Sequence, residues 1–420
     1  MRKMTLVACF FFVIPGVLRA QTNTQVQERL KALEERIAAL EAEIQGLKAA
    51  QAAAPGPPAP GGAPAAQPAA PPTEVQIPAG APLTPSGPLP VYGGAAAMAK
   101  VLNPDISVIG DFIAAPGRNP IRPEPAIQMH ESEVGLQAIV DPYARADFFL
   151  SFGEQGVNLE EGYMTFTSLP WGLVAKVGKF RSSFGVVNTL HNHVLPWVDR
   201  PLVTENLVGG EDGINDAGLS INRILPAPKG LFLEAIAQVF RGDSGEVFTA
   251  TRRGDVSAVG RLRAYRDLSE STNVDLGLSY ARGHNGVGSA FRTQLYGIDA
   301  TLRWKPLRRA IYHSFLGRTE LVWSRREQLA SFERAFGFYS SADYRLSRRW
   351  TIGGRYDRSD RAQNAALTDS GFSPVVTYWP SEFSQVRAQY RFTHYADGRY
   401  GNDLLFQFLF VLGAHGAHPF

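Results

Sequence analysis

The segment YGIDATLRWK, residues 296–305, alternates apolar and polar residues without a break. Its apolar positions are Tyr296, Ile298, Ala300, Leu302 and Trp304. Successive side chains of a β-strand point to opposite faces, so this period of two predicts a strand with one oily and one hydrated face. The same period recurs at 273–280, 350–357 and 385–392.

Sixteen such segments can be counted between Asp105 and Phe420, and the gaps between them alternate between short and long. Asp141-Pro142-Tyr143 is a typical short gap. The long gaps include 117–126, 182–213, 242–254, 283–291 and 359–369. A chain that crosses a membrane as strands turns tightly on one side and loops more freely on the other. The pattern therefore predicts an all-β transmembrane barrel of about 16 antiparallel strands.

The tryptophans support this interpretation. Trp171, Trp304, Trp350 and Trp379 all flank short gaps. Tryptophan is enriched at membrane interfaces, where transmembrane barrels carry aromatic girdles. We therefore expect these four side chains to mark one membrane interface.

The first residues resemble an export signal. Met1-Arg2-Lys3 is followed by an apolar run over 6–17 and by Ala20, which predicts a signal peptide over 1–20. After it, no stretch reaches the roughly 18 consecutive apolar residues that a membrane helix needs. Cys9, the only cysteine, lies in this leader, so the mature chain can form neither disulfides nor cysteine metal sites. We expect an exported protein of the bacterial outer membrane.

The region between the leader and the barrel divides into two parts. Residues 23–48 have apolar residues spaced alternately four and three apart, which predicts a coiled-coil helix. Residues 49–99 are dominated by Ala, Pro and Gly, which predicts an extended linker. The barrel is expected over 100–420. With both barrel ends on the tight side, the N-terminal region would be periplasmic.

Charge is distributed unevenly along the predicted barrel. Residues 100–250 contain 11 Lys and Arg against 18 Asp and Glu, whereas residues 251–361 contain 21 against 11. One side of the wall should therefore be much more positive than the other.

Basic residues fall on the polar faces of the predicted strands and are candidate pore-lining, anion-selective residues. They are Lys176, Arg261, Arg263, Arg303, Lys305, Arg318, Arg345, Arg355, Arg387 and Arg391. Rings of Arg and Lys favour anions because the low-dielectric wall focuses their field on the permeating ion. The alternative is that the arginines brace the wall by pairing with acids on neighbouring strands. The candidate partners are Asp275, Asp299, Glu320, Asp343 and Asp357.

Histidines could add a metal site. His191 and His193, or His415 and His418, could bind a divalent ion, but a third ligand is not evident from sequence, and we predict neither a metal nor a cofactor. The chain has no glycine-flanked serine elbow and no glycine-rich phosphate loop. We predict that it is not an enzyme, and no nucleic-acid partner is expected.

Several motifs resemble a known family. The stretches PDISVIGD at 104–111, EGYMTF at 161–166, LPWGL at 169–173 and VGKFRSSFG at 177–185 resemble the phosphate-selective porins O and P and their porin relatives. This resemblance implies a homotrimer of sixteen-stranded barrels that pass anions through a constriction lined by basic side chains. It also implies that the third long loop folds inward. The constriction-loop residues would be His191, His193, Asp199, Arg200, Glu205, Glu211 and Asp212. Arginine outnumbers lysine here, so the resemblance does not fix phosphate as the solute.

Taken together, the sequence predicts a passive diffusion channel for small hydrophilic solutes, with a preference for anions. One alternative is a structural anchor in outer-membrane lipid whose coiled coil grips the cell wall or a periplasmic partner. Another is a channel that takes up divalent metal ions through the histidine-bearing loop.

Overall fold

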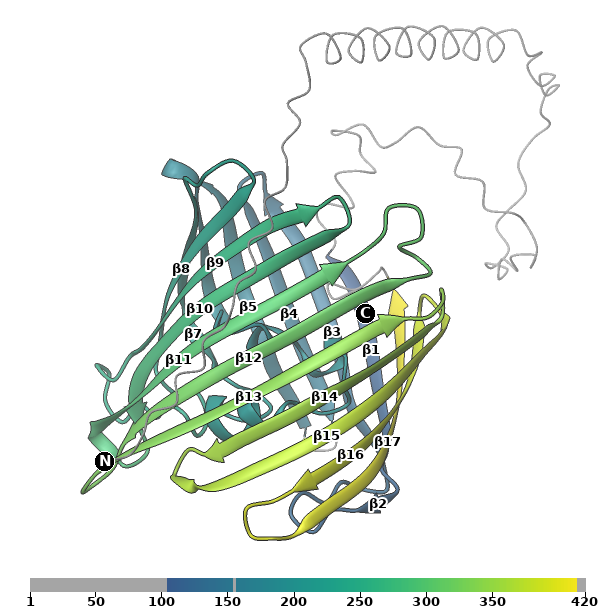
Figure 1. Ribbon diagram of the computed structural model, residues 1–420. Coiled ribbons are helices and arrows are strands. Elements are labelled where there is room, and N and C mark those ends of the chain that lie inside the picture. The colour runs from purple at the N-terminus through teal and green to yellow at the C-terminus, as the bar shows by residue number, and fades with distance from the viewer. Residues whose placement is uncertain (1–103, 154–155, 414–420) are drawn as a thin grey trace, which may run out of the picture. The chain divides into compact units, whose positions relative to one another are not determined.

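A computed structural model describes residues 104–153 and 156–413 (Figure 1). The predicted signal peptide, coiled coil and linker, as well as His415 and His418, lie outside these residues. Among the described residues, sixteen antiparallel strands follow one another around a single ring. The strands are β1 (Asp105–Ala114), β3 (Ile127–Asp141), β4 (Ala144–Gly153), β5 (Gly156–Leu169), β6 (Leu173–Arg181), β7 (Asn215–Leu225), β8 (Leu231–Phe240), β9 (Ser257–Ser269), β10 (Thr272–Asn285), β11 (Gly288–Trp304), β12 (Ser314–Glu327), β13 (Phe332–Arg345), β14 (Trp350–Arg361), β15 (Asn364–Ser381), β16 (Ser384–His394) and β17 (Tyr400–Gly413).

The first and last strands close the ring. β1 pairs with β3 on one side and with β17 on the other, in a register that runs from Ser107 opposite Gly413 to Ala114 opposite Phe406. A short extra strand, β2 (Gly117–Arg118), adds to β17 near one rim. Closure removes free strand edges, which a bilayer would leave without hydrogen-bond partners. The predicted sixteen-stranded barrel is confirmed.

The two faces of the wall follow the alternation in the sequence. In β10, Leu276 and Leu278 are 49% and 54% exposed on the outer face, whereas Asp275 and Ser279 are buried on the inner face. An outer apolar surface and an inner polar one are what a membrane barrel requires. We call the rim with the tight connections, such as the one between β3 and β4, the turn side, and the opposite rim the loop side.

Two of the predicted long gaps are instead hairpins of extended strand. β10 continues to Asn285 and β11 starts at Gly288, while β14 continues to Arg361 and β15 starts at Asn364. The strands are long: β11 has 17 residues and β15 has 18, against the roughly 9–11 that cross a bilayer. They therefore project beyond the membrane on the loop side. There, the polar composition of a segment does not show whether it is a strand or a loop.

One predicted girdle residue lies elsewhere. Trp350 is 45% exposed on the outer face, and its ring centre lies 4.6 Å from that of Tyr378. Trp379, one residue further along β15, belongs to the inner face, where its ring lies 5.5 Å from the Arg345 guanidinium. A shift of one residue along a strand exchanges its faces, so flanking a turn does not by itself place a tryptophan in the girdle.

Helical structure in the described residues is limited to short turns. These are η1 (Pro170–Gly172), η2 (Val187–Thr189), η3 (Asn192–Val194) and η4 (Thr204–Val208). No described helix has the length and apolar character needed to span a membrane. Three of the four turns lie in the connection between β6 and β7.

Candidate functional site: the channel lumen and its inward loop

The connection between β6 and β7, residues 182–214, lies inside the ring of strands, where Figure 1 shows its short helical turns. We call it the inward loop. Its residues contact strands on several sides of the wall, and Trp197, Leu195 and His191 are almost completely buried. The structure thus places the predicted constriction loop within the lumen.

An apolar cluster holds the loop in place. Phe184, Val187, Leu195, Trp197 and Leu207 of the loop pack against inner-face residues of the wall. Those wall residues include Phe240, Val259, Ala281, Leu295, Val322, Ala335, Tyr339 and Val375. The rings of Trp197 and Tyr339 meet edge to face at 5.2 Å. Burial of large side chains gives roughly 1.5–3 kcal/mol each, so the cluster is a substantial attachment. The expected hydrated inner face is therefore interrupted by a second core.

Hydrogen bonds fix both ends of the loop. The Asn188 side chain donates to the carbonyls of Ser182 and Ile214 at 2.9 and 3.1 Å, and accepts from the Ile214 amide at 2.8 Å. On the opposite wall, Glu320 of β12 accepts from the amides of Val186 and Val187 at 2.9 and 2.8 Å. Buried backbone groups need such partners. Glu320, one of the predicted bracing acids, braces the loop and not an arginine.

An arginine lock joins the loop to β14 and β16. Asp199 of the loop binds Arg355 at 2.9 Å and Arg391 at 3.3 Å, and Arg355 also binds Asp357 of its own strand at 2.7 Å. The Arg355 guanidinium lies 4.8 Å from the centre of the Trp197 ring. Burial alone raises the pKa of Asp199, but the charges of the two arginines lower it to about 2.

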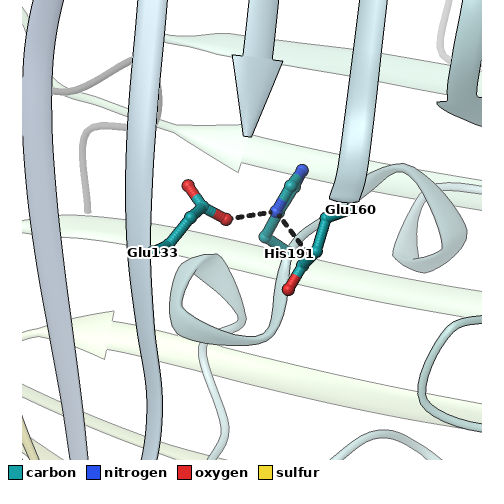
Figure 2. Close-up of side chains that lie close together, drawn as sticks. All are labelled: Glu133, Glu160 and His191. Carbon is teal, nitrogen blue, oxygen red and sulfur yellow. Dashed lines mark hydrogen bonds and ion pairs between the residues drawn. The ribbon is translucent and has the colours of Figure 1, made fainter. Parts of the chain in front are cut away.

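An acidic cage joins the loop to β3 and β5. His191 Nδ1 lies 2.7 Å from Glu133 and 3.0 Å from Glu160, while Nε2 lies 2.9 Å from Glu161. Figure 2 shows the carboxylates of Glu133 and Glu160 converging on the imidazole. Burial alone lowers the pKa of His191, but its bonds to Glu133, Glu160 and Glu161 raise it well above its usual value. The imidazole is thus held by three carboxylates.

A β-bulge explains how two neighbouring glutamates enter one cage. Phe149 of β4 pairs with Glu161 and Leu150 pairs with Leu159, so Glu160 is the extra residue in β5. An extra residue redirects the side chains on one strand. Both Glu160 and Glu161 are consequently buried on the inner face, which strict alternation would forbid.

Most of the predicted pore-lining arginines are paired with acids. Arg261 binds Asp299 at 2.8 Å, Arg263 binds Asp275 at 2.6 Å, and Arg303 lies 3.7 Å from Asp275. Arg391 binds Asp403 at 3.0 Å in addition to Asp199. Together with Arg355, these residues brace the wall and the loop, as the alternative interpretation expected.

Three arginines form a separate group on the turn side. Arg318, Arg345 and Arg387 line a cavity of about 230 Å³ together with His193 and Asp343. Arg387 donates to the Trp197 carbonyl and to Gln407 and Gln385. Among the described residues, no carboxylate pairs with these three arginines within 4.0 Å. The described lining of this cavity thus carries three arginines and one aspartate.

Two cavities on the loop side are lined by more acids than arginines, whereas a third, of about 580 Å³, is lined by Arg122, Arg326 and Arg361 with Glu205 and Glu246. A cavity of about 650 Å³ is lined by Glu131, Glu160, Glu211 and Asp212, with Arg181 among them. A smaller one of about 170 Å³, lined by Asp199, Arg200, Glu205 and Arg391, shares Asn192 and Glu211 with it. The loop segment 192–200 lies between these cavities and the turn-side cavity.

The remaining predicted residues have local roles. Lys176 lies 3.8 Å over the Tyr163 ring, and Lys305 follows the end of β11. Arg200 donates to the carbonyls of Leu190 and Val187, which ties the loop to itself, and burial lowers its pKa to about 9. Burial raises the pKa of Glu205, which lies 3.3 Å from Arg122.

Sequence reasoning missed the residues that complete the cage. Glu131, Glu133, Glu160 and Glu161 were not candidates, although His191 was. The available signal was local acid density on predicted strands, as a Glu-x-Glu at 131–133 and a Glu-Glu at 160–161. His193, which was named with His191, lies in the same buried region, with its ring 5.7 Å from that of His191.

The closed barrel has the same fold as solved bacterial outer-membrane porins and channels. The anion-selective porin of Comamonas acidovorans superposes with a TM-score of 0.54 at 12% identity, covering 74% of this chain and 99% of that one. OprB of Pseudomonas putida gives a TM-score of 0.52 at 9% identity, covering 74% and 94%. The outer-membrane channel DcaP of Acinetobacter baumannii gives 0.51 at 12% identity, covering 74% and 96%. At sequence identities this low, these similarities show a shared fold and nothing more.

A sequence relative defines the family. An uncharacterised protein of Aquifex aeolicus is 30% identical over 335 residues, covering 70% of each chain. The chain belongs to the same family as that protein. No protein-family model matches the sequence.

Proposed function

We propose that the protein is an outer-membrane channel through which small hydrophilic solutes diffuse, and that it prefers anions. The observation that carries this proposal is the closed barrel with a polar inner face and a loop fixed across the lumen. Proteins with this architecture are outer-membrane porins and channels, and one of them is an anion-selective porin.

The anion preference rests on the turn-side cavity. Arg318, Arg345 and Arg387 face the same space, and among the described residues of its lining Asp343 is the only acid. On the loop side, Glu133, Glu160 and Glu161 contact His191, and Glu160 also contacts Arg181, which offsets part of the acidic charge there. Uncompensated charge inside a low-dielectric wall dominates ion selectivity. The resemblance to the phosphate-selective porins also favours anions as solutes.

Reversal potentials test this proposal. The purified protein is inserted into planar bilayers, and the potential is measured across a KCl gradient. We expect chloride preference in the wild type and a clear shift towards cations in Arg318→Gln/Arg345→Gln. Arg325→Gln is the matched control, because Arg325 lies on the same strand as Arg318 but is exposed on the outer face. Absence of conductance would contradict the channel, and cation preference in the wild type would contradict the anion clause.

We also propose a homotrimer, which the resemblance to porins implies and which cross-linking in detergent would detect. The tether remains a second proposal for residues 22–90. Deleting that segment should leave conductance unchanged and weaken the envelope or its periplasmic contacts. Unchanged envelope integrity and unchanged pull-down of periplasmic partners would contradict it.

A further inference from the structure

The acidic cage has more negative charge than its cations balance. Four glutamates, Glu131, Glu133, Glu160 and Glu161, are all buried. The basic residues that contact them are His191, Arg181 and, at 4.0 Å from Glu133, His193. Burying a charge without a partner is strongly unfavourable. The cage therefore lacks positive charge.

Glu131 locates the deficit. It is 7% exposed, and no N–H or hydroxyl group among the described residues donates to its carboxylate oxygens. Its carboxyl group faces that of Glu160 within hydrogen-bonding reach. Two carboxyl groups that meet in a buried site are held together by a shared proton or by a metal ion.

The two ring nitrogens of His191 contact different carboxylates. Nε2 is bonded to Glu161 at 2.9 Å, and Glu161 in turn accepts from the Arg181 amide at 2.7 Å. Nδ1 faces the other way, towards Glu133 and Glu160 (Figure 2). In metal sites, a carboxylate on the second ring nitrogen fixes the imidazole so that the first can bind the ion. Glu161 is the carboxylate that fixes the imidazole here, through Nε2.

We propose that Glu131, Glu133, Glu160 and His191 Nδ1 form a binding site for one divalent transition-metal ion, with Zn²⁺ as the best match. The ligand atoms of Glu133, Glu160 and His191 already lie within 4.8 Å of one another. Ligands around a tetrahedral zinc at about 2.0–2.1 Å are separated by roughly 3.3 Å. The present separations of 2.7 and 3.0 Å from Nδ1 need only a small expansion.

The ligand set also favours this class of ion. One imidazole nitrogen with carboxylate oxygens suits zinc and its neighbours, whereas calcium and magnesium prefer oxygen alone. The ion can reach the site, because Glu131 and Glu160 line the loop-side cavity of about 650 Å³. A bound metal would link β3, β5 and the inward loop through coordinate bonds. This inference does not depend on conductance or on ion selectivity.

The test uses the full-length protein in detergent, stripped with EDTA and then titrated with ZnCl₂ in a calorimeter. Bound zinc is counted by elemental analysis after gel filtration. We expect one zinc per chain in the wild type, displaced little by excess Mg²⁺ or Ca²⁺. In Glu133→Gln/Glu160→Gln, zinc affinity should fall at least about 10-fold.

Two further variants separate this site from other sources of zinc binding. Glu131→Gln, which keeps the size of the side chain and can still hydrogen-bond to Glu160, should weaken zinc binding while keeping the barrel folded, as judged by its gel mobility before and after boiling. His415→Gln/His418→Gln should bind zinc as the wild type does. Absence of zinc from the folded wild type would overturn the proposal. Wild-type zinc affinity in either the Glu131 variant or the Glu133/Glu160 variant would also overturn it.

Discussion

The inward loop is attached to two opposite kinds of wall. On β3 and β5 the wall supplies acids and the loop supplies a base, His191. On β14 and β16 the wall supplies Arg355 and Arg391 and the loop supplies an acid, Asp199. At each of these two attachments, the charge of the loop residue is opposite to that of the wall residues. The loop spans a lumen that is negative on one side and positive on the other.

The two attachments also differ in how completely their acids are paired. In the arginine lock, Asp199, Asp357 and Asp403 each contact a guanidinium, and Trp197 lies over that of Arg355. In the acidic cage, three glutamates contact His191, but Glu131 contacts no basic side chain among the described residues. A site whose acids all have basic partners resists change, whereas one with an acid left over can accept a further ion. This difference predicts which attachment is the stronger.

Removing the centre of the arginine lock should have the largest effect. Arg355→Ala leaves the buried Asp357 and the partly buried Asp199 with too little positive charge, which in comparable cases is unfavourable by about 3–5 kcal/mol. We expect faster backbone hydrogen exchange over residues 197–203, measured by mass spectrometry. The control is Arg358→Ala, on the other face of the same strand. Equal exchange in both variants would contradict the lock.

Removing the base from the cage should have a smaller effect. His191→Gln takes the imidazole from Glu133, Glu160 and Glu161, but a carboxylate left in a buried cluster can take up a proton. In metal-free protein we expect a loss of about 2–3 kcal/mol. Hydrogen exchange should rise over 187–194 and stay unchanged over 197–203. A rise at both ends of the loop would show that the attachments act as one unit.

Acid should leave the arginine lock intact to a low pH. The pKa of Asp199 is lowered to about 2 in the folded protein, below about 3.9 in an unfolded chain. Its contribution, about 2 kcal/mol, is therefore complete above about pH 4 and is lost as the pH falls through about 2. Exchange over 197–203 should stay slow at pH 4 in the wild type and be fast in Asp199→Asn. Equal protection of the two proteins at pH 4 would refute this assignment.

Releasing the ends of the loop should have the smallest effect. Asn188→Ala removes the bonds to Ser182 and Ile214, which we expect to destabilise the loop by about 1–2 kcal/mol. Single-channel recordings should show more current noise without a change in reversal potential. Thr189→Ala is the control, because Thr189 is exposed and its hydroxyl contacts only the nearby Val186 carbonyl. Identical noise in the two variants would argue against a role for Asn188.

The barrel wall could be predicted from the sequence because its signal is repeated. The period of two assigns Leu276 and Asp275 to opposite faces without any knowledge of their neighbours. The position of the inward loop could be inferred from its length and from resemblance. Both depend on features that are local in the chain.

The attachments of the loop could not be predicted in the same way. Leu295 and Val322 are apolar residues on faces that are mostly polar, and only the folded loop shows that Trp197 and its neighbours cover them. Glu160 enters the cage through a bulge, which alternation does not reveal. Pairing also depends on distance across the lumen, which is why Arg355 and Arg318 looked alike in sequence and differ in the structure.

The apolar cluster inside the barrel sets an order of assembly. Its side chains come from strands as far apart in the chain as β6, which contains Phe180, and β15, which contains Val375. Contacts between such distant segments form late, since the intervening chain must be ordered first. The loop can pack in its final position only when nearly all strands of the barrel have formed around it. Until then a nascent barrel would present Trp197 to water, so a cell that makes this protein must shield that surface during the last stage of folding.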